Sequence, residues 1–558
     1  MAKIPHRNRS SMKKKLILTL FVLSIVLAGL HMLLFWGGSG NVIDIIQGNM
    51  PPSTELKDRE VSFTGGSASD TIFITASIDT SKPVMKVLPE YLSFTLDTSQ
   101  LVGGKWWNPK ADKVETGSGT KHAPVFDFNR EHLDILVSGL TPAYLRIGGS
   151  EADKMYYDLS DNRDYADKKD VPQGYHQTMT RKQWDNLNKF VKRNNLKFAF
   201  TLNSGPSART KTKKWDPQNA EALMKYSREK QYEIDVFELG NEHNLFWYIY
   251  GLSNIISPDQ YQEDIRQLKT LTSKYYPNAQ VGSQGSAIWP VLGELLGAFF
   301  GFYNGMIEKS GKDVDIIAWH YYPQQSRRGP FASRKAHPAR LLDPENLDEA
   351  ALWANVFTGL RNKHAPEKGI WLGETGNAQF GGEPGVSDVY IAGLWWLDQL
   401  GLLAVNRVEA VFRQTLAGMN YGMMNPDTLE LNPDYWNSLL WKKLMGTNVY
   451  SVSIKNKKNP KIRMYAHSNF DGAGVSILII NLDHQKKAAI TFDTLKQKSG
   501  VLYQVTTPDI LGKDVYLNGK KLELVNDKYL PPITGQILSG KETSTIIVNP
   551  LSYTFIQF

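Results

Sequence analysis

Residues 236–244 read VFELGNEHN, an apolar run that stops abruptly at the pair Asn241 and Glu242. A buried parallel strand presents its polar residues at its carboxyl end, because only there does the backbone leave the apolar core. Glu242 is therefore the first candidate for a catalytic residue. A single carboxylate after a strand is more often a helix cap or half of a surface salt bridge, so this stretch needs a partner elsewhere in the chain.

A second stretch has the same form. Residues 370–376 read IWLGETG, in which a short apolar strand and Gly373 are followed by Glu374. Two carboxylates presented in the same way predict one site, and such a pair is the minimum needed to cleave a glycosidic bond. One carboxyl group protonates the leaving oxygen while the other attacks or stabilises the anomeric carbon. This chemistry needs no cofactor, and the histidines show no metal-ligand spacing such as HExxH, so no metal is expected.

The composition is that of a globular protein with room for more than one domain. Of the 558 residues, 41% are hydrophobic and 22% are charged, and none is cysteine, which excludes a disulfide-stabilised scaffold. The formal net charge of +8 favours an acidic partner, such as an anionic membrane, nucleic acid or an acidic polysaccharide. The charge alone does not choose among these three.

The first 69 residues divide into three segments. Residues 1–15 are basic, residues 16–36 contain no Asp, Glu, Lys or Arg, and residues 37–69 are polar with Pro and Gly pairs. A helix needs about 20 apolar residues to cross a bilayer, so residues 16–36 predict a transmembrane signal anchor with the basic segment in the cytoplasm. Residues 37–69 then form a linker to an extracytoplasmic catalytic part. Cleavage of a signal peptide, which would give a secreted protein, is the alternative.

Between residues 83 and 447, short apolar segments alternate with helical patterns. Such alternation predicts an α/β fold with a parallel sheet, and eight units fit a (β/α)8 TIM barrel. A doubly wound open sheet is the alternative, but no GxGxxG motif follows an early strand. The helical patterns include residues 180–194, 219–230 and 258–275. The predicted strands are residues 92–97, 143–147, 197–202, 234–239, 279–282, 315–320, 369–373 and 408–413.

From residue 448 to the end, strands follow one another without helices. Several short strands separated by turns predict a β-sandwich domain, which a strand within residues 70–82 joins from the other end of the chain. Asn518 and Gly519 form a favourable hairpin turn. The predicted strands of this domain are residues 462–467, 474–481, 488–492, 501–506, 522–525, 545–548 and 553–558.

Polar residues follow every predicted barrel strand. In a barrel the carboxyl ends of the strands meet at one face, so Glu242 after the fourth strand and Glu374 after the seventh are expected in one site. A lone arginine or histidine at such a place is often a buried ion-pair partner or a core residue, but eight polar strand ends together predict a substrate site. The further candidates on this face are Asp97, Arg146, Ser150, Asn203, Gln284, His320, Tyr322 and Arg413.

Five stretches of the chain match a known family. They are residues 139–149 (GLTPAYLRIGG), 238–242 (ELGNE), 371–375 (WLGET), 413–422 (RQ and NYG at its two ends) and 432–436 (NPDYW). On these residues the chain resembles the heparanase-like enzymes of glycoside hydrolase family 79, in the order of that family. The resemblance implies a retaining mechanism in which Glu242 is the acid/base and Glu374 the nucleophile.

The resemblance also implies the residues around the cleaved sugar. Asn241 is expected to hold the sugar 2-hydroxyl group, while Asp97 and Ser150 line the same subsite. Tyr421, together with the turn at Gly381 and Gly382, is expected to recognise the carboxylate of a uronic acid. This chain departs from the family just before those glycines, where it has Gln and Phe instead of a Tyr followed by a Gly run, so this part of the pocket is expected to differ in shape.

The charge of the substrate is predicted from the loop that follows the sixth strand. Residues 323–342 contain five basic residues, among them Arg327 and Arg328, and no acidic one. A basic run is usually a solvated surface, but this one is expected on the rim of the active face, where it could hold sulfates or carboxylates. The sequence thus predicts a monomeric endo-β-glucuronidase acting on heparan sulfate-like chains or hyaluronan, and no nucleic-acid partner. An exo-acting β-glucuronidase and a non-catalytic, membrane-tethered polysaccharide-binding protein are the alternatives.

Overall fold

The computed structural model describes residues 71–107, 121–290, 302–329, 332–455 and 459–558. The basic segment, the membrane anchor and the linker predicted within residues 1–69 therefore lie outside the described residues. Within the described ranges, none of the helices combines the length and the apolar character that crossing a membrane requires.

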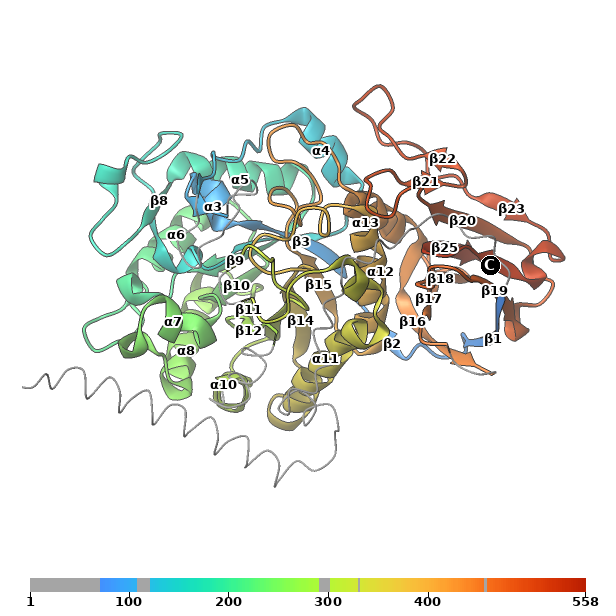
Figure 1. Cartoon of the computed structure of the whole chain (residues 1–558). Helices are drawn as coiled ribbons and strands as arrows, with labels where there is room; N and C mark the ends of the chain where they lie inside the picture. The colour runs from blue at the N-terminus through green and yellow to red at the C-terminus, as the bar shows by residue number, and fades with distance from the viewer. Residues whose placement is uncertain (1–70, 108–120, 291–301, 330–331, 456–458) are drawn as a thin grey trace, which may run out of the picture. The chain divides into compact units, whose positions relative to one another are not determined.

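A closed barrel of parallel strands forms the larger part of the described chain (Figure 1). Its eight strands are β3 (Leu92–Asp97), β6 (Tyr144–Gly148), β9 (Lys197–Leu202), β10 (Val236–Leu239), β11 (Gln280–Gly282), β13 (Ile316–Tyr321), β14 (Gly369–Thr375) and β15 (Ala410–Arg413). The barrel closes because β15 pairs with β3 and β11 pairs with β13. This finding confirms the predicted TIM barrel. A ninth strand, β12 (Ser286–Ile288), extends the pairing beside β13 and was not predicted.

The helices between the strands begin where the sequence provides caps. Thr180 and Gln183 form a capping box at the start of α5, because each side chain accepts a hydrogen bond from the backbone N–H of the other. Ser257 caps α8, which has Pro258 in its first turn. The three helices predicted from the sequence are observed within one residue of their expected bounds. The longer helices are α4 (Glu131–Ser138), α5 (Arg181–Arg193), α6 (Gln218–Glu229), α8 (Pro258–Tyr275), α10 (Phe302–Ser310), α11 (Pro344–His364), α12 (Tyr390–Val405) and α13 (Pro433–Leu444).

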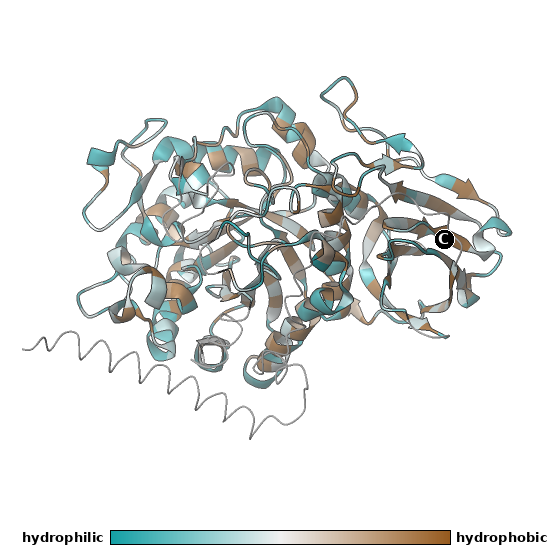
Figure 2. Cartoon of the chain, viewed as in Figure 1, coloured by the Kyte–Doolittle hydropathy of each residue, from teal (hydrophilic) through white to brown (hydrophobic). Residues whose placement is uncertain are grey.

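Aromatic side chains fill one end of the barrel. Trp371 contacts Tyr144 and Phe412, with ring centroids 4.9 Å and 5.4 Å apart. These rings belong to one buried cluster with aliphatic residues such as Val236 and Ile316. Apolar residues are concentrated along the strands and hydrophilic ones on the outer parts of the helices (Figure 2). Truncating Trp371 to Ala would cost about 3–5 kcal/mol of stability, because it would open a cavity in this cluster.

A second sheet of 12 strands contains the C-terminal part of the chain. Its strands form one hydrogen-bonded path around a single apolar core, which includes Ile479, Ile490 and Val548, and the predicted sandwich arrangement stays a prediction. Its strands are β1 (Thr71–Asp79), β2 (Met85–Lys86), β16 (Met445–Ile454), β17 (Ile462–Asn469), β18 (Val475–Asn481), β19 (Lys487–Phe492), β20 (Gly500–Thr506), β21 (Tyr516–Leu517), β22 (Lys520–Lys521), β23 (Gln536–Leu538), β24 (Ile546–Val548) and β25 (Ser552–Gln557).

The N-terminal strand lies inside this sheet. β1 pairs antiparallel with β16 and parallel with β19. Asn518 and Gly519 have φ angles of 48° and 78° and connect β21 to β22 in the predicted hairpin. The strand predicted at residues 522–525 was wrong, since only Val525 there makes a strand-like contact, an isolated bridge to Tyr529.

Buried charges join the sheet to the barrel. Asp398 on α12 accepts hydrogen bonds from Arg463 Nε at 2.8 Å and from the Tyr465 hydroxyl at 2.6 Å, both on β17. Asp398 is fully buried, so removing Arg463 would leave an uncompensated charge. The domain boundary predicted at residue 447 falls inside β16 and stays a prediction.

Candidate active site

The backbone turn after β10 carries Glu242. Glu242 has a φ of 52° and a ψ of 54°, a left-handed conformation that residues with a Cβ rarely adopt. Its backbone N–H donates to the carbonyl of Gln284 at 2.8 Å, which holds this conformation. The Glu242 carboxyl group is 7% exposed, and burial raises its pKa to about 7, while the charge of Arg146 opposes that rise. A carboxyl group of this kind holds a proton near neutral pH.

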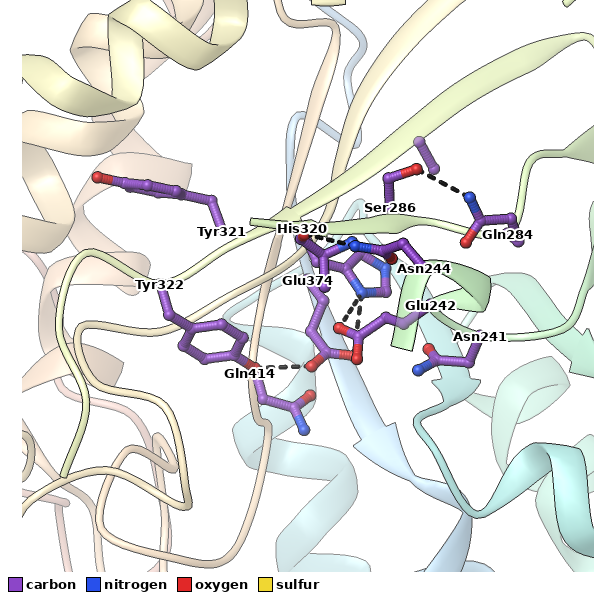
Figure 3. Close-up of polar contacts among 12 residues, drawn as sticks. Asn241, Glu242, Asn244, Gln284, Ser286, His320, Tyr321, Tyr322, Glu374 and Gln414 are labelled. Carbon is purple, nitrogen blue, oxygen red and sulfur yellow. Dashed lines mark hydrogen bonds and ion pairs between the residues drawn. The ribbon is translucent and has the colours of Figure 1, made fainter. Parts of the chain in front are cut away.

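His320 lies directly against Glu242 (Figure 3). Its Nδ1 atom is 2.8 Å from Glu242 Oε1. Burial lowers the pKa of His320 to about 4, so the ring is neutral at pH 7. Gly285 has a φ of 65° and leaves room for the ring, because a Cβ atom there would lie 2.2 Å from His320 Nε2. The pair can therefore share one proton without bringing a second positive charge into the site.

Glu374 occupies the carboxyl end of β14 and receives two hydrogen bonds. The Tyr322 hydroxyl donates to Glu374 Oε1 at 2.7 Å (Figure 3). Arg146 Nη1 donates to Glu374 Oε2 at 3.1 Å. A carboxylate oxygen of Glu242 and one of Glu374 lie within 4.8 Å of each other. Retaining glycosidases hold their carboxyl groups about 5–5.5 Å apart and inverting ones about 6.5–9.5 Å apart, so this pair has the shorter arrangement.

Arg146 connects the two halves of the site. This buried side chain on β6 donates through Nε to Glu238 at 2.8 Å, through Nη1 to Glu374, and through Nη2 to Asn241 Oδ1 at 3.0 Å. Glu238 accepts a further hydrogen bond from the Thr201 hydroxyl at 2.7 Å. The guanidinium thus supplies one positive charge to two carboxylates and fixes their direction.

The same cluster could ligate a metal by distance alone. Glu242, His320 and Glu374 each offer one ligand atom within 4.8 Å of the others. The Arg146 guanidinium at 3.1 Å from Glu374 already provides the counter-charge that a metal would provide. The hydrogen bonds account for the cluster as an acid/base pair, and the absence of a metal stays a prediction.

Asn241 and Asp97 border the carboxylate pair. Because Asn241 Oδ1 accepts from Arg146, its Nδ2 group is the donor available to a ligand. Asp97 caps the short helix α3 (Thr98–Val102), and burial raises its pKa to about 7, with the charge of Glu374 adding to the rise. Ser150 is half-buried in the loop after β6, next to a glycine that packs on Asp97.

The turn expected to bind a carboxylate lies beside Tyr421. Gly381 and Gly382 have φ angles of 82° and 79°, and a Cβ on Gly382 would lie 2.7 Å from Tyr421 N. Tyr421 is buried with its ring 6.4 Å from that of Tyr322, which itself contacts Glu374. Burial raises the pKa of Tyr421 far above its usual range, so its hydroxyl stays a hydrogen-bond donor.

Three predicted substrate-binding residues have their polar atoms engaged within the scaffold. Asn203 donates to the Met155 carbonyl and accepts from Gly205 N, both at 2.8 Å. Gln284 accepts from the N–H of residue 243 and donates to the hydroxyl of residue 286, also at 2.8 Å. Arg413 is fully buried and pairs with Asp434. These contacts describe residues that hold the active face in shape.

Acidic residues outside the basic loop neutralise part of it. Arg327 Nε donates to Glu383 at 2.9 Å, and Arg334 pairs with Glu349 at 2.5 Å. The loop itself contains no acidic residue, as the sequence shows, but the fold supplies these partners. Arg328 is half-buried and its Nη2 donates to the Gly382 carbonyl at 2.8 Å.

Three residues of the site were not singled out from the sequence. Glu238 lies inside the apolar strand β10, and a charged residue in such a run is a signal of an ion pair that could have identified it. Asp153 lies in a short 3-10 helix and Glu383 in a loop, and no local pattern marks either of them. Their contacts depend on partners that only the fold brings close.

Comparisons with known proteins agree with this geometry. Residues 74–401 match glycosyl hydrolase family 79, N-terminal domain. The chain is 28% identical over 540 residues to heparanase of Mus musculus, which covers 88% of this chain and 94% of that protein. It is 28% identical over 463 residues to hyaluronoglucuronidase of Hirudo nipponia, covering 77% and 89%. The GH51 arabinofuranosidase from Xanthomonas axonopodis pv. citri shares the fold, with a TM-score of 0.60 at 14% identity, covering 87% of this chain and 99% of that chain.

Proposed function

Since this chain belongs to glycosyl hydrolase family 79, we propose that it is a retaining endo-β-glucuronidase that hydrolyses anionic polysaccharides containing glucuronic acid. The observation that carries the proposal is the pair of buried carboxyl groups within 4.8 Å of each other in unlike environments. Glu374 faces a guanidinium, whereas Glu242 faces a neutral imidazole. Such a difference separates a nucleophile from an acid.

In the first step, the Glu374 carboxylate attacks the anomeric carbon and a covalent glycosyl-enzyme forms. Arg146 donates a hydrogen bond to one Glu374 oxygen before the attack, and the Tyr322 hydroxyl orients the second oxygen. Glu242, with its raised pKa, donates its proton to the departing oxygen. The bond from the anomeric carbon to that oxygen breaks as the bond to Glu374 forms.

In the second step, water replaces the departed sugar. Glu242 is now ionised and removes a proton from this water, which attacks the anomeric carbon and releases Glu374. The neutral His320 ring can donate from Nδ1 to the ionised Glu242 and accept from the protonated form, since either tautomer leaves the ring uncharged. Asn241 is proposed to hold the sugar 2-hydroxyl group through its Nδ2 donor.

The substrate class rests on the pocket and on the relatives. Tyr421 and the turn at Gly381 and Gly382 are proposed to bind the uronate carboxylate, with Arg328 next to them. Relatives named heparanase and hyaluronoglucuronidase support heparan sulfate-like chains or hyaluronan. We further propose a monomer, anchored by residues 16–36, with the catalytic part outside the cytoplasm.

The test is digestion of size-defined hyaluronan, heparan sulfate and an aryl β-glucuronide by the purified full-length protein. The variants Glu242→Gln and Glu374→Gln serve as controls. Internal chain shortening that both variants abolish would support the endo-enzyme. Release of the aryl alcohol without shortening of either polymer would support an exo-acting enzyme instead. If all three proteins bound the polymers equally and none cleaved them, the function would be polysaccharide binding without catalysis.

A further inference from the structure

Three consecutive backbone N–H groups of the turn that carries Glu242 donate hydrogen bonds to residues of other segments. Asn241 N donates to Asp153 Oδ2 at 2.8 Å. Glu242 N donates to the carbonyl of Gln284, and His243 N donates to its Oε1 atom, both at 2.8 Å. The left-handed conformation of Glu242 places these groups outside the strand ladder, so the turn depends on Asp153 and Gln284 for its acceptors.

Asp153 receives more hydrogen bonds than this one. It lies in a short 3-10 helix (Ala152–Lys154) after β6 and is only 1% exposed. Its Oδ1 atom accepts from Ser204 N at 2.9 Å and from Ser204 Oγ at 3.2 Å. Burial raises the pKa of Asp153 to about 6, which leaves it ionised and acceptor-only at neutral pH. One carboxylate therefore ties the loop after β9 to the turn after β10.

The residues around the Asp153 carboxylate are closely packed. Ser204 Oγ lies 2.5 Å from His243 Nε2. A Cβ atom on Gly240, which has a φ of 76°, would lie 2.1 Å from each of these two atoms. Gly240, Ser204 and His243 thus form a close contact beside the turn. Asp153 is the charged member of this group and joins it to Asn241.

We propose that Asp153 is a positioning residue that sets the direction in which Glu242 delivers its proton. Asn241 is fixed at its main chain by Asp153 and at its side chain by Arg146, at 3.0 Å. Glu242 follows Asn241 directly, so a shift of the Asn241 peptide moves the acid. Asp153 acts through these neighbours, and the inference rests on the proposed glucuronidase function.

The test compares two aryl β-glucuronides with wild type and Asp153→Asn. Dinitrophenoxide leaves without a proton, whereas phenoxide needs one from Glu242. In the variant an amide N–H₂ faces one of the N–H donors, so the turn shifts. We expect kcat/KM, which reports the first bond cleavage, to fall about 10²-fold for the phenyl glucuronide and less than about threefold for the dinitrophenyl one.

The matched control is Asp398→Asn, which alters a buried carboxylate bound to Arg463 on the far side of α12. It should lower the melting temperature and keep the wild-type ratio of the two rates. If Asp153→Asn does not fold, Ser204→Ala replaces it and should show the same selective loss on a smaller scale. Equal losses on both substrates, or no loss, would overturn the inference. A wild-type protein that cleaves neither glucuronide and shortens neither hyaluronan nor heparan sulfate would instead overturn the proposed function.

Discussion

Arg146 and Arg413 lie on two strands of the same barrel and both are buried, yet their hydrogen-bond partners differ. Arg146 reaches Glu374 and the residues beside it. Arg413 pairs with Asp434 on α13 and lies over two tryptophan rings at 5.5 Å. Residue type and burial are alike in the two cases. The acceptor that the fold brings to each guanidinium distinguishes them, because Arg146 faces the proposed nucleophile and Arg413 faces Asp434.

The largest effect is expected from removing the two acceptors. Glu374→Gln should lower kcat on an aryl glucuronide by about 10⁴-fold or more with little change in stability, because the nucleophile is lost. Asp434→Asn should cost about 3–5 kcal/mol of folding free energy, because Arg413 stays buried without its counter-charge. Below its melting temperature this second variant should retain activity. Kinetics and thermal denaturation of both variants measure these effects. If Asp434→Asn were as inactive as Glu374→Gln, the distinction between the two arginines would be wrong.

The next largest effect is expected from replacing the two arginines, whose variants should differ in kcat. Arg146→Met should reduce kcat by about 10²–10³-fold, the loss typical of removing one charge-stabilising donor. Arg413→Met should reduce kcat by less than about threefold at a temperature where the variant is folded. Steady-state kinetics at 10 °C, with circular dichroism to verify folding, measures both. Similar kcat losses in the two variants would mean that Arg413 also serves the reaction.

The pH profile sharpens the same contrast. Activity needs protonated Glu242, whose pKa is raised to about 7, so kcat/KM should fall about tenfold per pH unit above that value. The Arg146 charge favours the ionised form of Glu242. Removing that charge in Arg146→Met should therefore raise the pKa and move the alkaline limb to higher pH. In Arg413→Met the alkaline limb should stay at the wild-type pH. A shift of that limb would mean that Arg413 also affects the pKa of Glu242.

The smallest effect is expected from replacing two arginines of the basic loop. Arg328→Ala should raise KM for an aryl glucuronide by about tenfold, or 1.4 kcal/mol, because Arg328 stands beside the proposed carboxylate pocket. Arg327→Ala should change KM by less than about twofold, since the exposed Arg327 side chain is already paired with the buried Glu383. The neutral aryl glucoside provides the control, because neither variant should change its KM.

The barrel was predictable because its signal is local. Eight apolar segments with polar ends specify a parallel sheet, and the strands observed agree closely. β16 was missed because Met445–Ile454 follows α13 without a turn signal, so nothing local marks the change from helix to strand. The prediction of a strand at residues 522–525 was wrong because a strand also requires a partner. The hairpin strands β21 and β22 pair with each other instead.

The site was predictable in its carboxylates and less so in its surroundings. Glu242 and Glu374 follow strands, and strand ends meet at one face, so topology alone brings them together. The engagement of Gln284 and Arg413 depends on donors and acceptors from distant segments, which no local pattern reveals. For the same reason the pairing of Arg327 with Glu383 could not be inferred from the loop sequence.

The place of β1 in the second sheet bears on the order in which the protein is made. Ala76 and Thr71 pair with residues 454 and 487, so this strand waits for partners synthesised more than 370 residues later. Long-range pairing of this kind forms slowly and leaves strand edges unpaired meanwhile. On a ribosome the barrel strands emerge before either partner of β1. A truncated chain that begins after Asp79 would complete its barrel yet expose the edge of β19 to aggregation.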